Sequence, residues 1–415
     1  MLVNRCSLAI VFIVMSLINV YAQAGNKSEN VVKKELSAAK GYLKSGNDLE
    51  KGEQSMLKLL KDSANRDNEK IWETLIELVK KQYDKGNEQM YLKQKADTGK
   101  LFVNARKLFD VCQAYDSVLC QPGRKDREVE KFRKKHIETL LQYRRNLYNG
   151  GMFFVKKQNF KEAFSMFDTF IGCNSQPMFS NYHLMQTDSA SALKAAYMSM
   201  YCGYKMKDAQ ATLKYASLSM RDTACLNNKY QYLAETYLLE KDTARCVATL
   251  EKGFERFPLS LYYFPRLFNY YFKTMGDMTQ TRRICDYALR ADSTSMVFLF
   301  AYSSLMLQQE QFETCIDICD QLIARNDTLA DAYLNAGLAY FNQTIKISNS
   351  PALMRNQRAR LRNLYNSARP YMEHYRQLCP DKRDIWGLPL YTIYLNLNMG
   401  KEFEEIENIL ENGKK

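Results

Sequence analysis

Residues 149–154 read Asn-Gly-Gly-Met-Phe-Phe, residues 159–163 read Asn-Phe-Lys-Glu-Ala, and Phe167 follows one helical turn after Ala163. Gly151 has no side chain, so it allows two helices to approach each other closely. An aromatic side chain such as Phe167 then fills the space beside the contact. The stretch therefore predicts two helices that pack on each other as a pair.

The same register recurs later in the chain with a period close to 34 residues. Four small residues are separated by 34, 35 and 34 positions: Thr212, Cys246, Thr281 and Cys315. The residues three before, four after and seven after each of them are mostly apolar or small, and these offsets trace one stripe of a helix. Because one such pair leaves a face uncovered, neighbouring pairs must stack to supply the core.

Two further units preserve the pattern well. One contains Ala332-Tyr333 and Asn335-Ala336-Gly337, with Ala368, Met372 and Pro380 in or after its second helix. The other contains Leu233-Ala234 and Tyr237, followed by Cys246, Leu250 and Pro258. With the stretch at 149–167, these units resemble the N-x-G-x-x-Y and Y-x-x-A-x-x-x-F signature of tetratricopeptide-repeat (TPR) proteins. The period of 34 residues is also typical of that family.

The resemblance implies an all-α fold, a right-handed α-solenoid of about nine TPR-like helix pairs. In such arrays the first helix of each pair lines a concave face that binds peptides or proteins. Carried over by position, the groove-facing residues expected to bind a partner are Tyr148, Asn149, Met152, Lys156, Tyr232, Glu235, Leu239, Asn335, Leu338 and Asn342. The array lacks the further Asn and basic residues of a carboxylate clamp, so capture of a chaperone C-terminus is not expected.

The chain is expected to divide by composition and repeat quality, with no conventional domain boundary. The expected segments are a signal peptide (1–22), basic TPR-like pairs with inserts (27–172), a long connection (173–190), regular TPR units (191–329), and C-terminal TPR units (330–415) with an inserted segment near 348–362. A further long insert is expected around residues 85–100.

The composition agrees with long helices and short connections. Hydrophobic residues make up 46% of the 415 residues and charged residues 25%, as in folded proteins. Only 17 glycines and 8 prolines are present, fewer than strands and loops usually need. This balance excludes collagen-like, disordered and disulfide-scaffold proteins.

The N-terminus predicts export. Arg5 precedes an apolar run that continues to Val20, and small residues at Ala22 and Ala24 suit cleavage by a signal peptidase. No later stretch is predicted to cross a membrane. We therefore expect the protein in the periplasm, with association with the outer membrane as a further option; an uncleaved anchor is the alternative.

Two features resemble exported TPR proteins of Bacteroidota. One is a signal that ends in Tyr-Ala-Gln. The other is a short Asp-[Ser/Thr]-small/aliphatic pattern, associated there with O-glycosylation. The same residues are favoured as helix N-caps, so inter-helix turns explain the pattern as well. The matches begin at Asp62, Asp116, Asp188, Asp222, Asp242, Asp292 and Asp327.

The net charge of +13 is concentrated in residues 27–157. A basic region can attract anionic lipid, anionic polysaccharide or acidic proteins, or it can be the solvated face of several helices. Nucleic acid is not expected as a partner, because acidic residues interrupt the basic helix from Arg124 to Arg145 and export separates the protein from most nucleic acid.

No catalytic set, cofactor site or metal site is predicted. The three histidines, His136, His183 and His374, have no metal-type spacing, and no glycine-rich phosphate loop is present. Most core cysteines are expected to be small buried hydrophobes. Cys112 and Cys120 are the best candidates for a disulfide.

These observations predict a non-enzymatic scaffold that binds a protein or peptide in the cell envelope. The alternative is an envelope accessory protein that binds polysaccharide or anionic lipid. It would use the aromatic segment 261–272 and the basic first third of the chain, although such aromatics are more often helix core.

Overall fold

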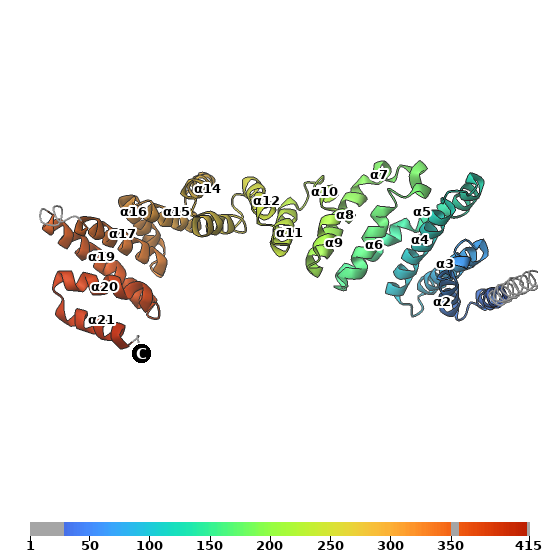
Figure 1. The fold of residues 1–415 in the computed structure, drawn as a ribbon, viewed down its shortest axis with the longest axis horizontal. Helices are drawn as coiled ribbons and strands as arrows, with labels where there is room; N and C mark the ends of the chain where they lie inside the picture. The colour runs from blue at the N-terminus through green and yellow to red at the C-terminus, as the bar shows by residue number, and fades with distance from the viewer. Residues whose placement is uncertain (1–28, 350–356, 413–415) are drawn as a thin grey trace, which may run out of the picture. The chain divides into compact units, whose positions relative to one another are not determined.

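The computed structural model describes residues 29–349 and 357–412, and within them it contains helices and helical turns but no β-strand (Figure 1). The predicted signal peptide and part of the segment near 348–362 lie outside these ranges. None of the helices in the described ranges is both long enough and apolar enough to cross a membrane.

The helices form two compact units, and the boundary along the chain lies between Asp242 and Thr243. The repeat pattern in the sequence did not predict this boundary. The described part of unit 1 begins with a helix over residues 29–45. It continues with α2 (Leu49–Leu60), η1 (Ser63–Asn65), α3 (Glu69–Tyr91), α4 (Thr98–Leu119), α5 (Asp126–Lys156), α6 (Phe160–Gly172), η2 (Pro177–Tyr182), α7 (Leu184–Thr187), α8 (Ser189–Met206), α9 (Ala209–Lys214), α10 (Ala216–Ser219) and α11 (Leu226–Leu239).

Unit 2 is built in the same way. It contains α12 (Thr243–Arg256), α13 (Phe264–Phe268), the π-helical segment η3 (Asn269–Met275), α14 (Met278–Ala291), α15 (Met296–Gln308), α16 (Phe312–Arg325), α17 (Ala330–Ser348), α19 (Arg358–Leu378), α20 (Arg383–Leu397) and α21 (Gly400–Asn412). In each unit, helices that follow one another along the chain pack side by side.

The order of helices confirms the predicted all-α solenoid. Four hairpins precede α11 in the described part of unit 1, four follow α12 in unit 2, and α11 and α12 succeed each other across the boundary. Each unit thus contains four hairpins in the part of the chain that the structure describes.

Five pairs are joined by the same tight turn. A non-glycine residue adopts a left-handed conformation, with φ between 55° and 60°, and the next residue's N–H donates to the carbonyl five positions back. This bond satisfies a carbonyl that the end of the first helix would otherwise leave unpaired. The left-handed residues are Gln158, Lys207, Lys241, Glu310 and Asn398.

Small residues set the distance between the two helices of a pair. A Cβ atom on Gly151 would lie 2.5 Å from the ring of Phe167, and one on Gly337 would lie 2.6 Å from the sulfur of Met372. The sequence pattern predicted the first of these contacts and placed Gly337 and Met372 in the two helices of one unit. In the α8–α9 hairpin the approach is closer still, since a Cβ on Gly203 would lie 2.3 Å from the backbone nitrogen of Thr212.

The expected insert around residues 85–100 is mostly helical. Helix α3 continues to Tyr91, and only residues 92–97 separate it from α4. The segment 173–190 contains two short helical pieces, η2 and α7, before α8 begins at Ser189. Of the Asp-Ser/Thr matches, Asp116 was wrongly assigned to a turn, because it lies inside α4 and pairs with Arg133.

Three of the eight lysines and arginines of α5 form ion pairs with carboxylates from other elements of unit 1. Arg133 donates two hydrogen bonds to the Asp116 carboxylate, at 2.7 and 2.9 Å. Arg144 is buried, lies 3.9 Å from the Phe170 ring centre and donates to Asp188 at 2.7 Å. Burial alone would raise the pKa of Glu73, but the neighbouring His136 and the hydrogen bond from Lys135 outweigh it and lower this pKa to about 2. These contacts tie α5 to its neighbours.

The predicted disulfide between Cys112 and Cys120 is wrong. Cys112 is buried in α4, Cys120 is exposed at the end of the same helix, and both are free thiols. Eight helical residues correspond to a rise of about 12 Å. A disulfide needs Cα atoms within about 7 Å.

We expect Gly203→Ala to lower the free energy of unfolding by about 1–3 kcal/mol, because the added methyl group meets the backbone of α9. Gly172→Ala, at the end of α6, is the control, since nothing lies within 4 Å of its added Cβ. Urea denaturation followed by circular dichroism measures both. Equal midpoints for the two variants would contradict the close contact.

Candidate partner-binding surface

A hollow with a volume of about 470 Å³ opens in unit 1 where α8, α9 and α11 meet. The end of α8 and the start of α9 supply one wall, and the last turns of α11 supply the other. The residues that line it are Tyr204, Lys205, Lys207, Asp208, Ala209, Thr212, Glu235, Thr236, Leu238 and Leu239.

A cluster of four tyrosines adjoins this hollow. Tyr197, Tyr201 and Tyr204 lie on α8 at spacings of four and three residues, so they share one face of the helix. Each of them packs against Tyr232 of α11, and the rings of Tyr204 and Tyr232 stack with centroids 4.4 Å apart. Burial and a hydrogen bond with Tyr197 raise the pKa of Tyr232 above its usual value, so this hydroxyl stays neutral at physiological pH.

Lys229 anchors α11 beneath the tyrosines. The residue is fully buried, and its Nζ donates hydrogen bonds of 2.8 Å to the carbonyls of Ser219 and Asp222. Its Nζ lies 5.4 Å from the ring centre of Tyr197. Burial lowers the pKa of Lys229, while the nearby Asp222 opposes this shift. The lysine therefore satisfies carbonyl groups at and just after the end of α10, and it holds α11 against them.

The rim of the hollow combines exposed apolar and cationic side chains. Leu238 is 61% exposed and Leu239 is 50% exposed. The Nζ of Lys205 lies 5.6 Å and 5.9 Å from the ring centres of Tyr201 and Tyr204. Tyrosines are enriched where proteins bind one another, and exposed apolar side chains beside them offer area that a partner can cover.

The sequence pattern located part of this surface. Of the residues predicted to bind a partner, Glu235 and Leu239 line the hollow, and Tyr232 lies beside it in the tyrosine cluster. The α8 and α9 side of the hollow was missed because its repeat is degenerate. The signal that could have identified it is the series Tyr197, Tyr201 and Tyr204, whose spacing places three tyrosines on one helix face.

The four candidates on α5 lie outside the hollow. Tyr148 is half-buried between the rings of Phe167 and Phe170, with centroids 5.8 Å from each. Met152 is also half-buried against the core of unit 1. Asn149 and Lys156 are exposed. The structure therefore divides this group into two packing residues and two surface residues.

The candidates on α17 lie in unit 2, and one of them has a clear structural role. Asn335 is buried, and its Nδ2 donates to the hydroxyls of Ser303 at 3.1 Å and Ser304 at 3.0 Å. It therefore joins α17 to α15 and offers little surface to a partner. Leu338 and Asn342 are half-buried on the same helix.

The aromatic segment 261–272 contributes two rings to the core of unit 2. Tyr263 and Phe264 are buried, and Phe264 packs edge-on against Phe298 with centroids 4.7 Å apart. These two rings are not accessible to a polysaccharide. Leu261, at the start of the segment, is 62% exposed.

The histidines lie apart from one another. His136 contacts Glu73, His183 is exposed ahead of α7, and His374 packs on the ring of Tyr333 with centroids 4.2 Å apart. Within residues 29–349 and 357–412, no group of three or more His, Cys, Asp or Glu side chains is placed to hold a metal ion.

We expect Asn335→Leu to destabilise unit 2 by about 1–3 kcal/mol, because two buried hydrogen bonds to α15 are lost. Asn342→Leu on the same helix is the matched control, with an expected change below about 0.5 kcal/mol. Chemical denaturation of both variants measures the difference. A fully stable Asn335→Leu variant would return Asn335 to the group of partner-binding candidates.

Comparisons with known proteins place three solved structures of TPR proteins among those similar to this chain. The C-terminal part of a TPR repeat-containing protein from Cytophaga hutchinsonii is 12% identical, with 64% of this chain and 94% of that chain covered and a TM-score of 0.41. The TPR domain of P58(IPK) is 10% identical, with 92% of this chain and 99% of that chain covered and a TM-score of 0.26. Yeast Tom70 is 11% identical, with coverages of 92% and 88% and a TM-score of 0.25.

No protein-family model and no curated protein matches the sequence. The assignment of helical repeats therefore depends on the hairpins themselves and on the small residues at their contacts.

Proposed function

We propose that the protein is an exported, non-enzymatic scaffold that binds a protein or peptide partner in the cell envelope. The observation that carries this proposal is the hollow between α8, α9 and α11, with its exposed leucines and its tyrosine cluster. The periplasm, at or near the outer membrane, is the proposed location, and the signal-like residues 1–22 support it.

The chemistry of the hollow favours an amphipathic polypeptide segment as its occupant. Leu238 and Leu239 offer apolar area that is now in contact with water, so covering it is favourable. Lys205, Lys207 and Asp208 lie on the opposite wall and Glu235 lies on the wall of the leucines, so the lining offers polar groups of both charges to a polypeptide. Tyr204 contributes a large side chain that loses little conformational freedom when a partner binds.

Binding of anionic polysaccharide or lipid by the basic first third of the chain is the weaker alternative. Lys135 is already paired with Glu73, Arg133 with Asp116, and Arg144 with Asp188. An anionic partner would have to compete with these carboxylates. The charge of α5 is therefore less available than the sequence suggested.

We test the proposal with a photo-crosslinking amino acid at position 239 in intact cells, with position 388 as control. Leu388 is also an exposed leucine, 66% exposed, but it lies on α20 of unit 2. We expect a reproducible protein adduct from position 239 and none of the same mass from position 388.

A second arm uses the double variant Leu238→Gln/Leu239→Gln and the matched pair Leu388→Gln/Leu395→Gln, whose leucines are equally exposed. Recovery of the partner should fall about tenfold or more for the first pair only. Equal recovery with both pairs would reject the hollow as the binding surface. Failure to recover any protein from the wild-type chain would reject the scaffold function, and recovery of polysaccharide or lipid alone would favour the alternative.

A further inference from the structure

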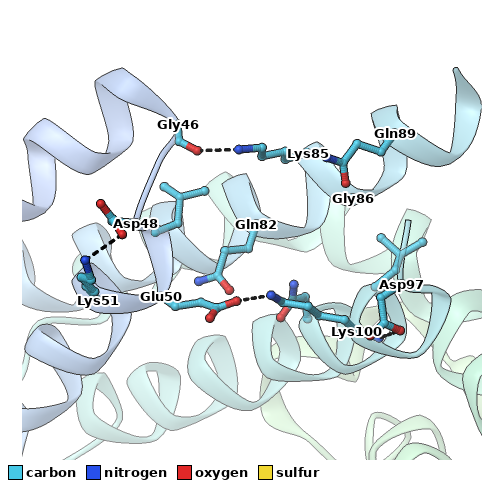
Figure 2. Close-up of a pocket in the computed structure, with 13 residues that line it drawn as sticks. Gly46, Asp48, Glu50, Lys51, Gln82, Lys85, Gly86, Gln89, Asp97 and Lys100 are labelled. Carbon is cyan, nitrogen blue, oxygen red and sulfur yellow. Dashed lines mark hydrogen bonds and ion pairs between the residues drawn. The ribbon is translucent and has the colours of Figure 1, made fainter. Parts of the chain in front are cut away.

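A second cavity, with a volume of about 440 Å³, lies between the first two hairpins of unit 1 (Figure 2). The start of α2, the second half of α3 and the first half of α4 form its walls. It is lined by Gly46, Asp48, Leu49, Glu50, Lys51, Gln82, Lys85, Gly86, Gln89, Asp97, Lys100, Leu101 and Asn104. None of these residues belongs to the hollow proposed above for the partner.

The charged side chains of the cavity balance one another. Three lysines face three carboxylates, so the lining has no net charge. Lys51 pairs with Asp48 at 2.9 Å, and Lys100 pairs with Glu50. Figure 2 shows both pairs and the Lys85 side chain, which donates to the carbonyl of Gly46 at 3.0 Å. An ionic ligand would have to break these contacts.

The amide side chains, in contrast, have unused hydrogen-bonding capacity. Asn104 is only 4% exposed, lines the cavity, and makes no side-chain hydrogen bond to any residue that the structure describes. Gln82 is 8% exposed and donates to Glu53 at 2.8 Å, but its Oε1 accepts no hydrogen bond. Buried polar groups without partners are costly, so most are satisfied by protein, water or ligand.

Apolar side chains complete the lining. Leu49 and Leu101 are both largely buried, and they border the cavity from α2 and α4. Gly86 of α3 also lines the cavity and lies close to Leu101, since a Cβ there would meet the Leu101 side chain at 3.3 Å. The cavity therefore offers neutral hydrogen-bonding groups beside short apolar patches.

We propose that this cavity binds a neutral saccharide of one or two rings. Each hydroxyl of a sugar both donates and accepts, so it meets the needs of the Asn104 amide and of an acceptor such as Gln82 Oε1. The C–H face of the ring covers Leu49 and Leu101. The volume is within the range of about 300–1,000 Å³ that is usual for small-ligand sites.

The test uses the full chain and ligand-observed NMR, followed by calorimetry. The probes are glucose, galactose, mannose, N-acetylglucosamine, maltose and cellobiose, each up to about 50 mM, a range that detects millimolar affinity. Glucuronate and inorganic phosphate are the anionic probes. We expect at least one neutral sugar to bind, and to bind more tightly than either anion.

Two variants test the site, and one serves as the control. Asn104→Leu removes the amide at nearly constant volume, and Gly86→Phe fills the cavity from the half-exposed face of α3 while Asn104 is retained. Each should weaken binding tenfold or more. Asn149→Leu, at an exposed position of α5, should leave it unchanged. Gly86→Phe keeps the test valid if Asn104→Leu fails to fold.

Three outcomes would overturn the proposal. They are no binding of any neutral sugar by the wild-type chain, binding that survives Gly86→Phe, and preferential binding of glucuronate or phosphate. This inference does not depend on the proposed partner, because the double variant Leu238→Gln/Leu239→Gln leaves the cavity intact. Sugar binding retained in that variant distinguishes failure of the scaffold function from failure of the saccharide site.

Discussion

The structure depends on the close approach of the two helices in each hairpin, which small residues make possible. Gly151 lies against Phe167, Gly337 against Met372, and Gly203 against the backbone of α9. A pair held this closely still leaves one apolar side uncovered, and only the next pair can bury it. Within each unit, this requirement places every helix against its neighbours in chain order. The surfaces that remain accessible are therefore defined by where the stack leaves side chains uncovered.

Much of the fold could be predicted from the sequence, because contacts between helices act through spacing along the chain. The contact between Gly151 and Phe167 was predicted correctly, and so was the all-α array of hairpins. The candidate site was harder to predict. A residue on the first helix of a repeat can face the open surface or the first helix of the adjacent repeat. Residues of both kinds recur with the same spacing along the sequence, so the spacing does not distinguish them. Leu239 is exposed in this position, whereas Asn335 is buried against α15.

Charge gives a second example of what spacing cannot show. The lysines and arginines of α5 form a basic run in the sequence, but three of them, Arg133, Lys135 and Arg144, pair with carboxylates from α4, α3 and the segment before α8. The same principle applies to the cavity between the first two hairpins, where three lysines are balanced by three carboxylates. On α5 these pairs reduce the attraction for anions that the net charge of +13 suggests, and in the cavity the charges balance. Hydrogen-bonding groups and apolar area then become the features that select a ligand.

The recurrent left-handed turn between paired helices has a practical consequence for engineering. Gln158, Lys207, Lys241, Glu310 and Asn398 each hold a conformation that costs a residue with a Cβ about 1 kcal/mol, less for asparagine, whereas glycine adopts it freely. The backbone hydrogen bond of the turn does not involve their side chains. Substitution by glycine at each of these sites would thus raise the melting temperature by a small amount, and the effects at different hairpins would add. The buried contacts of both units would stay unaltered.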